Sequence, residues 1–381
     1  MTVVLTRRHL LTAALAAGAA VPWAGTGPAS AASTRLTLPK PTGPDVAGTV
    51  ALHLIDEARA GRELMISVWY PASRDVRHRS KAAWLADAPL RALLDANGFP
   101  ADAATSPITV AHENAPASRR IGRQPVILYS HGAGGHRSET TIVAQELVSH
   151  GYIVVTVDHT DDAYTQFPDG RLSLPADDRP ATPWGQVADM RFVLDRIEEL
   201  AAGGNPDAER RPLPEGLATA LDLRRVGMYG WSKGGTATAL MMNTDRRVQA
   251  GLSLDGPMES DPPVTRIDRP FMLMTAQFTR AAEPAVARFW SLLHGWRRNV
   301  QADGARHGGY CDHQWLIPEL ATITGMSNKD LTDWIGTLDP ATAVRIQQAY
   351  PLAFFEQHLR GRRQHLLAGP SPAFPEVRFL P

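Results

Sequence analysis

One serine of this 381-residue chain stands between glycines where an apolar run gives way to small residues. The stretch RVGMYGWSKGG places Ser232 directly after the apolar run and before GGTATALMM. A strand, a tight turn and a helix in this order hold a serine hydroxyl clear of a sheet, and the glycines let strand and helix approach closely. A phosphate-binding loop does not fit, because the lysine precedes the glycines and no Gly-Lys-Ser/Thr follows. The pattern predicts that Ser232 is a nucleophile.

A serine hydroxyl needs a base to take its proton and an acid to orient that base. With this type of turn the chain order is serine, acid, histidine, and the base lies in a loop after the last strands. Two histidines meet that condition, His307 in the Gly-flanked loop GARHGGYCDHQW and His313 in a helical segment that begins near Asp312, its expected cap. We expect His307 to be the base.

The acid must be a carboxylate at the carboxyl end of a strand between the serine and the histidine. The stretch GLSLDGPM supplies Asp255 at the end of an apolar run, followed by a Gly-Pro turn. The next strand is followed by MTAQFTRAAEP, in which Glu283 comes several residues too late. Asp255 is therefore the expected acid, and a structural capping role for it is the alternative.

Acyl transfer also needs backbone N–H groups that bind the oxyanion. One donor is expected from the residue after the nucleophile, Lys233, and the other from the Gly-rich loop of ILYSHGAGGHRSE, where Ala133 follows His131-Gly132. Trp231, beside the nucleophile, either lines the substrate cleft or packs inside.

These residues must be positioned by alternating strands and helices, which predict an α/β fold with a mostly parallel sheet of about eight strands and helices on both faces. The expected strands are Thr49–Ile55, Leu64–Tyr70, Val126–Ser130, Ile153–Asp158, Arg225–Tyr229, Ala250–Leu254, Phe271–Ala276 and Asn299–Ala302. Expected helices begin at Thr182-Pro183 and Asp339-Pro340 and run to Ala202 and about Leu359, with Pro351 as a possible kink in the second.

Two long loops are expected near the mouth of the site, at 160–183 and 203–214. The first carries aspartates at 161, 162, 169, 177 and 178, but they lack the spacing of a calcium loop, so a solvated acidic loop is expected. The single cysteine, Cys311, has no base of its own and is expected to be a small buried hydrophobe.

The N-terminal segment is expected to be an export signal rather than part of the fold. Paired arginines, Arg7-Arg8, precede an Ala-rich apolar stretch that ends at Ala29-Ser30-Ala31, the layout of a twin-arginine signal cleaved after Ala31. We therefore expect a secreted bacterial protein with residues 1–31 removed and 32–381 forming one domain. The apolar fraction of 44% allows a large core, and a net charge of zero argues against binding of nucleic acid.

Five stretches together resemble the plasma-type platelet-activating factor acetylhydrolases and their bacterial relatives, a branch of the α/β-hydrolases. They are YSHGAGGHR, VVTVDHTD, GWSKGG, LSLDGP and RHGGYCD, and the similarity spans roughly residues 64–359. The resemblance implies a Ser–Asp–His triad with the acid after the sixth strand, and an H-x-x-[FY]-x-D segment matched by His307, Tyr310 and Asp312. It also implies hydrolysis of short or oxidised acyl esters without a metal or other cofactor. Lys233 departs from the family, whose members commonly carry an apolar residue there.

The expected function is hydrolysis of carboxylic esters through Ser232, Asp255 and His307, with a small-molecule or lipid-like ester as substrate. A polyester or amide hydrolase with the same residues is one alternative, and a catalytically silent binding protein on the same fold is another. Beyond the N-terminus the sequence has no apolar run long enough to span a membrane, so at most peripheral lipid contact is expected. The sequence does not define acyl length, leaving group or oligomeric state.

Overall fold

The computed structural model describes residues 34–381 except 77, 121 and 177–180, so the expected export signal lies outside the described residues. The elements discussed below run, in chain order, as follows: β2 (Ala47–Asp56), β3 (Arg62–Pro71), β4 (Lys81–Ala83), α2 (Asp87–Ala96), β6 (Ile108–Glu113), β7 (Gln124–Ser130), α3 (Thr141–Ser149), β8 (Ile153–Asp158), β9 (Thr165–Gln166), β10 (Leu172–Ser173), α4 (Pro183–Ala201), α5 (Leu217–Ala220), β11 (Leu221–Trp231), α6 (Lys233–Thr244), β12 (Val248–Leu254), β13 (Phe271–Thr275), α7 (Pro284–Leu292), β14 (Arg297–Ala302), α8 (His313–Thr324), α9 (Asn328–Ile335), α10 (Pro340–Leu359) and β15 (Val377–Leu380). Shorter pieces are β1 (Thr34–Arg35) and β5 (Ala104–Thr105), and the 3₁₀ turns Glu57–Arg59, His307–Tyr310 and His365–Leu367.

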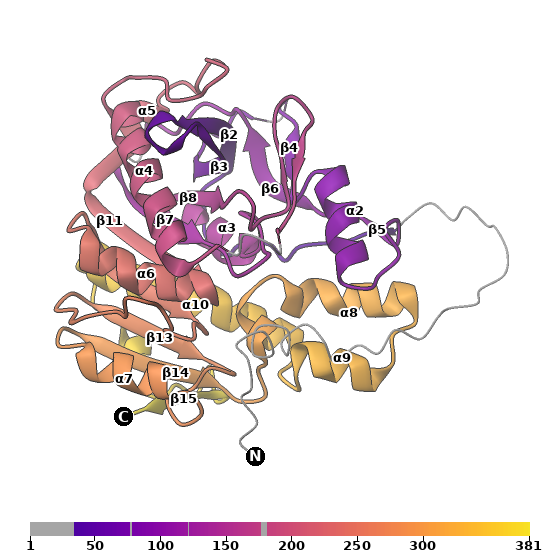
Figure 1. The fold of residues 1–381 in the computed structure, drawn as a ribbon, viewed down its shortest axis with the longest axis vertical. Helices are drawn as coiled ribbons and strands as arrows, with labels where there is room; N and C mark the ends of the chain where they lie inside the picture. Colours follow the sequence, from indigo (N-terminus) through magenta and orange to yellow (C-terminus); the bar gives the residue numbers. More distant parts are fainter. Residues whose placement is uncertain (1–33, 77, 121, 177–180) are drawn as a thin grey trace, which may run out of the picture.

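The central sheet has the strand order β15-β14-β13-β12-β11-β7-β8-β3-β2-β6-β4 (Figure 1). Its middle, from β8 to β14, is parallel throughout, whereas β3 pairs antiparallel with both β8 and β2. All eight expected strands are present, which confirms the α/β prediction. The sheet is larger than expected because β4, β6 and β15 extend its two ends. Edge strands are buried less completely than central ones, so their sequences lack the continuous apolar run that marked the others.

Helices cover both faces of the sheet, as the alternating pattern predicts. Buried side chains of α4, α6 and α7 form one core layer with the sheet, and those of α3 and α10 form the other. The two predicted helix starts are confirmed: the Thr182 hydroxyl accepts from the Gly185 N–H at 3.1 Å, and the Asp339 carboxylate accepts from the Thr342 N–H at 2.8 Å. Pro351 lies inside α10 without ending it.

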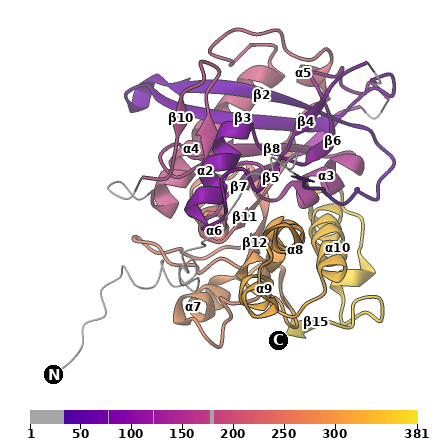
Figure 2. The same ribbon diagram turned by 90° about the vertical axis from the view of Figure 1, so that its right-hand side faces the viewer.

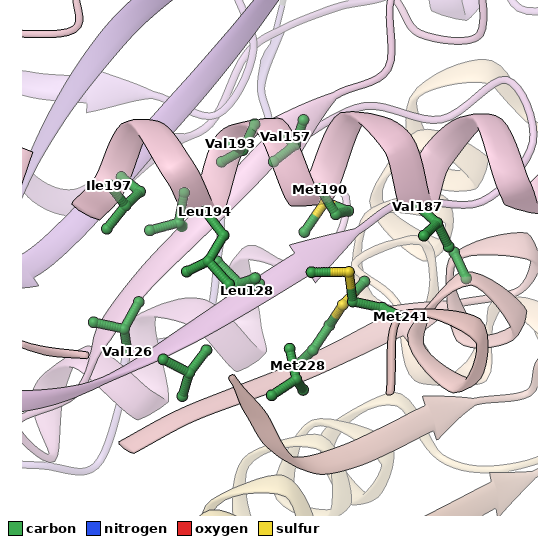
Figure 3. Close-up of a cluster of buried hydrophobic side chains, with 14 of the residues drawn as sticks. Val126, Leu128, Val157, Val187, Met190, Val193, Leu194, Ile197, Met228 and Met241 are labelled. Atoms are coloured by element: carbon green, nitrogen blue, oxygen red, sulfur yellow. The ribbon is translucent and has the colours of Figure 1, made fainter. Parts of the chain in front are cut away.

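Figure 3 shows why α4 lies where it does. Its apolar side chains at helical spacing point toward β7, β8 and β11, and Met241 of α6 closes the layer from the side. The residues that meet there, all buried, are Val126, Leu128, Val157, Val187, Met190, Val193, Leu194, Ile197, Met228 and Met241. This packing fixes the strand ends from which the loops of the candidate site emerge.

The helices α2, α8 and α9 gather on one side of the molecule (Figures 1 and 2). They share a separate apolar cluster in which Leu90 and Leu94 of α2 meet Leu316 and Leu320 of α8. Among the described helices, none combines the length and the apolarity needed to cross a bilayer.

Candidate active site

Ser232 stands at the junction of β11 and α6 with a backbone conformation that few non-glycine residues adopt. Its φ is 55° and its ψ is −122°, and it is the N-cap residue of α6. Its N–H donates to Leu254 O on the neighbouring strand β12 at 2.9 Å, and its own carbonyl accepts from the Gly235 N–H at 2.9 Å. The side chain is partly exposed. A strained residue held by hydrogen bonds on both sides is typical of a functional turn.

The glycines on either side of Ser232 are required by close approach. A Cβ at Gly230 would lie 2.1 Å from the carbonyl of Gly234, and a Cβ at Gly234 would lie 1.9 Å from Ser130 O. Both obstacles are backbone atoms, which cannot move aside as a flexible side chain would. The spacing that marked the turn in the sequence therefore has a steric cause: the start of α6 passes over the ends of β11 and β7.

Asp255 and His307 lie in hydrogen-bonding contact. His307 Nδ1 is 2.6 Å from Asp255 Oδ2. The buried Asp255 carboxylate also accepts three backbone N–H groups of the loop after β13, from Ala276 at 2.7 Å, Gln277 at 3.1 Å and Phe278 at 2.9 Å. Four hydrogen-bonding contacts around one carboxylate fix its orientation. This geometry suits an acid that orients a histidine.

The ring of His307 rests on Trp231, the residue before Ser232. The two rings are stacked with centroids 4.6 Å apart, and Trp231 Nε1 donates to His307 O at 2.9 Å. Phe278 meets the same imidazole edge-on at 5.0 Å. Trp231 thus packs inside, as a platform for His307. Within the described chain, no hydrogen bond joins the Ser232 hydroxyl to His307, a bond that in free enzymes is often long and tightens only with substrate.

The Gly-rich loop after β7 lies against the turn that carries Ser232. A Cβ at Gly132 would lie 2.5 Å from the Trp231 ring and 3.1 Å from Ser232 Cβ. The next residue, Ala133, is exposed. The N–H groups of Ala133 and of Lys233, the first residue of α6, donate to no other group of the described chain. Both amides are available to an anion beside Ser232.

The alternatives weighed from the sequence lie elsewhere. His313 is at the start of α8, where its ring meets Trp231 edge-on at 5.9 Å, and burial together with the neighbouring His307 lowers its pKa to about 4. Glu283 is the N-cap residue of α7, and Asp255 rather than Glu283 contacts His307. Cys311 is buried, as expected, and burial raises the pKa of its thiol.

Asp312 is the N-cap residue of α8, but the prediction that its side chain caps this helix is wrong. Its side chain makes no cap bond to α8 and instead accepts from the Thr141 and Ile142 N–H groups at the start of α3, at 2.8 and 3.0 Å. Trp84 Nε1 adds a third donor at 2.8 Å. Local spacing pointed to the nearest helix, whereas the tertiary structure brings a different helix N-terminus within reach of the buried carboxylate.

The expectation of a solvated acidic loop at 160–183 is also wrong for one residue. Asp162 is buried and pairs with the Lys233 ammonium. Within the described ranges, no three His, Cys, Asp or Glu side chains lie close enough to hold a metal ion. Asp177 and Asp178 lie outside the described residues.

A second Ser–His–Asp arrangement lies beneath the Gly-rich loop and was not found from the sequence. Ser130 Oγ is 2.8 Å from His159 Nε2, and His159 Nδ1 is 3.0 Å from Asp189 Oδ2. Asp189 also accepts from Arg62 Nε at 2.8 Å, and this hydrogen bonding holds the pKa of Asp189 below its usual range. Ser130, His159 and Asp189 are fully buried, so no substrate reaches them. Their contacts support the start of the loop that presents Ala133.

Glu139 is the buried acid at the other end of that loop. Its Oε2 accepts from the Gly132 N–H and from the Tyr129 hydroxyl, both at 3.3 Å. Burial raises the pKa of Glu139 from 4.5 to about 8, so the folded protein keeps this carboxyl protonated at neutral pH. Between these two values the folded state binds more protons here than the unfolded state. The stability that this group contributes is therefore complete below pH 4.5 and is lost as the pH rises toward 8.

Glutamine cannot ionise, so Glu139→Gln removes this loss. We expect the free energy of unfolding of the variant, relative to the wild type, to rise by on the order of 3 kcal/mol between pH 5 and pH 8. Urea unfolding of both proteins across this range measures it, with Glu259→Gln, at an exposed glutamate, as the matched control. A difference between Glu139→Gln and wild type that stays constant with pH would contradict the assignment.

A groove of about 970 Å³ lies away from Ser232, over β2 and β3. Its lining includes Ala51, Met65, Ser67, Arg137 and Tyr164. Ser232, Asp255 and His307 are not among the residues that line this groove.

Comparison with known proteins identifies relatives along most of the chain. A family model described as "Platelet-activating factor acetylhydrolase, isoform II" matches residues 30–168 and 207–366. A protein of Arthroderma benhamiae named "Probable 1-alkyl-2-acetylglycerophosphocholine esterase" is 26% identical over 92% of this chain and 96% of its own length. The platelet-activating factor acetylhydrolase of Cavia porcellus is 22% identical, but the match covers 62% of this chain and 58% of that protein.

Among solved structures, a ferulic acid esterase from Streptomyces cinnamoneus matches with a TM-score of 0.75 and 30% sequence identity. The match covers 92% of this chain and all of that one. The likeness therefore covers most of this chain and the whole of the other.

Proposed function

The chain belongs to the platelet-activating factor acetylhydrolase, isoform II, family and is a carboxylic ester hydrolase of the α/β-hydrolase fold; from this premise we propose that it works through Ser232, His307 and Asp255. The observation that carries the proposal is the contact between His307 and the buried Asp255, held over the tryptophan that precedes Ser232. This contact joins two segments far apart in the sequence, and the stacked tryptophan ties it to the turn that carries Ser232, which supports the proposal.

The proposed reaction has two halves. In the first, Ser232 Oγ attacks the ester carbonyl carbon and its proton passes to His307 Nε2, while the Ala133 and Lys233 N–H groups bind the oxygen that becomes negative. The tetrahedral intermediate then expels the alcohol, which takes the proton from His307. In the second half a water molecule gives a proton to His307 and attacks the acyl carbon. The second tetrahedral intermediate then expels Ser232 Oγ, which takes the proton back from His307, and the acid is released. Asp255 stabilises the charged imidazole in both halves.

We propose that the substrates are esters of short or oxidised acyl groups. The names of two relatives, both of which refer to acetyl groups, support this proposal. The Arthroderma benhamiae relative is named for a 2-acetyl glycerophosphocholine, whose acyl group is short. A second candidate, an ester of an aromatic acid, is favoured by the likeness to the ferulic acid esterase over its whole length.

The two candidates predict different substrate profiles. We expect the enzyme to hydrolyse p-nitrophenyl acetate and butyrate with a kcat/KM at least about tenfold above that for the palmitate, because a pocket shaped for a short chain rejects added methylenes. Methyl ferulate is the comparison substrate. Faster turnover of methyl ferulate than of methyl acetate would favour the aromatic ester, and preference for palmitate would overturn the short-chain proposal.

We further propose that residues 1–31 are an export signal removed after Ala31 and that 32–381 form one domain. The paired arginines and the Ala-Ser-Ala site support the first statement. The second is supported by the continuous sheet, which joins residues of β2 near the start of the described chain to those of β15 near its end.

A further inference from the structure

The side chain of Lys233 lies between the two ends of the loop at 160–183. Its Nζ donates to Ala181 O at 3.0 Å and pairs with the Asp162 carboxylate. Asp162 stands near the start of the loop and Ala181 near its end. The Lys233 and Asp162 side chains are only 14% and 9% exposed. One largely buried ammonium therefore joins both ends of the loop to the residue that follows Ser232.

Asp162 continues this connection to the Gly-rich loop. Its Oδ1 accepts from the Gly134 N–H at 3.1 Å. Its Oδ2 is 3.4 Å from Gln186 Nε2, and the same amide donates to His131 O at 3.1 Å. The backbone is thus held at 131 and at 134, on either side of Ala133. The next residues are tied to the loop as well, since the Tyr164 N–H donates to Gly135 O at 3.1 Å.

The charges of this pair depend on each other. A carboxylate as buried as Asp162 is costly unless a cation compensates it, and removing the partner of a buried ion pair leaves an unpaired charge. Asp161 neighbours the pair in sequence, but its backbone carbonyl accepts from the Ala176 N–H and its side chain lies toward Arg62. Without the Lys233 ammonium, Asp162 would have to turn toward water, and the Gly134 amide would lose its acceptor.

We propose that the Lys233 side chain and Asp162 form a positioning pair that aims the Ala133 amide at the oxygen of the substrate carbonyl. The inference rests on the proposed function of Ser232. Neither charged group touches the reacting atoms: the pair acts through the backbone of residues 131–134. The Lys233 side chain thereby contributes to the site in addition to the proposed oxyanion contact of its own N–H.

The test compares Lys233→Met with the wild type. Methionine keeps the backbone N–H and most of the side-chain volume but removes the charge. We expect kcat for p-nitrophenyl acetate to fall by roughly ten- to a hundredfold, with KM changed by less than about threefold, because a displaced oxyanion donor weakens transition-state binding alone. Lys233→Arg is expected to recover most of the loss, since a guanidinium also donates to both partners. Lys329→Met, which breaks an exposed pair with Asp333, is the matched control.

A second measurement separates positioning from damage to the fold. Ser232 Oγ adds to the carbonyl carbon of a trifluoromethyl ketone, and the serine proton passes to His307. The ketone oxygen then becomes an anion, which we expect at the Ala133 and Lys233 amides. We expect its Ki to rise in Lys233→Met by about the same factor as kcat/KM falls. A variant that merely contained less folded enzyme would lose activity while the remaining sites kept the wild-type Ki.

A double substitution completes the test. Asp162→Asn should lower kcat as Lys233→Met does, and the two together should lose little more than either one, because both break the same connection. The inference is overturned if Lys233→Met keeps kcat within twofold of the wild type, or if the Ki does not change. In either case an inactive Ser232→Ala would leave the proposed function intact, whereas an active Ser232→Ala would overturn that function itself.

Discussion

Replacing Ser232 with alanine is expected to lower kcat for p-nitrophenyl acetate by about a million-fold. The variant removes the hydroxyl that forms the acyl-enzyme, and the neighbouring amides and the Asp255–His307 pair cannot replace it. The fold should be unaffected, because the hydroxyl makes no hydrogen bond within the described chain and alanine keeps the Cβ. A residual rate, set by the oxyanion donors acting on water, is expected to remain above the uncatalysed reaction.

The measurement is the initial rate of the purified variant, with an active-site titration of the wild type. Ser291→Ala is the matched control, because Ser291 is exposed and donates only to Arg288 O one turn earlier on α7. Labelling with a fluorophosphonate adds an independent readout, since the wild type should be modified at Ser232 and the variant should not. Equal activity of the variant and the wild type would remove Ser232 from the mechanism.

Asp255→Asn is expected to lower kcat by about ten-thousand-fold while leaving the protein folded. The reason lies in the donors around the carboxylate. Oδ1 accepts from the Ala276 and Phe278 N–H groups, and Oδ2 faces both the Gln277 N–H and His307 Nδ1. An asparagine that keeps its oxygen toward the first two donors turns its NH₂ group toward His307. Nδ1 must then accept, the ring proton moves to Nε2, and the imidazole cannot take the serine proton.

The kcat of Asp255→Asn is compared with that of Asp303→Asn, which makes the same chemical change in an exposed pair with Arg378. Thermal unfolding of both variants shows whether the fold is kept. A loss of less than about tenfold in Asp255→Asn would mean that His307 keeps its tautomer without the carboxylate, and the proposed role of Asp255 would be wrong.

Much of this arrangement was predictable from the sequence because parallel strands impose an order on their loops. Buried strands read as apolar runs, and the residues that follow them meet at one edge of the sheet. Ser232, Asp255 and Ala133 each follow such a run, so their proximity could be expected from chain order. The choice of His307 over His313 rested on the same reasoning, since only the first stands in a loop before the helix.

Other features could not be predicted because they depend on contacts between segments distant in the chain. Asp312 stabilises the start of α3, about 170 residues earlier, and no local spacing indicates that partner. Asp162 looked like part of a solvated acidic loop, but the fold buries it beside Lys233. Charge patterns in a loop do not tell which carboxylate will be desolvated, because burial is decided by the elements that pack around it.

The sequence by itself determined the order of strands and helices, the strained turn at Ser232 and the identity of the groups at the candidate site. These follow from local rules: apolar periodicity, the steric freedom of glycine and the direction of parallel strands. Only the tertiary structure decided how the groups are held. The stacking of His307 on Trp231, the protonated Glu139 under Gly132 and the Lys233–Asp162 pair all arise where separate segments exclude water from one another. In such places the cost of burying a polar group depends on neighbours that the local sequence does not name.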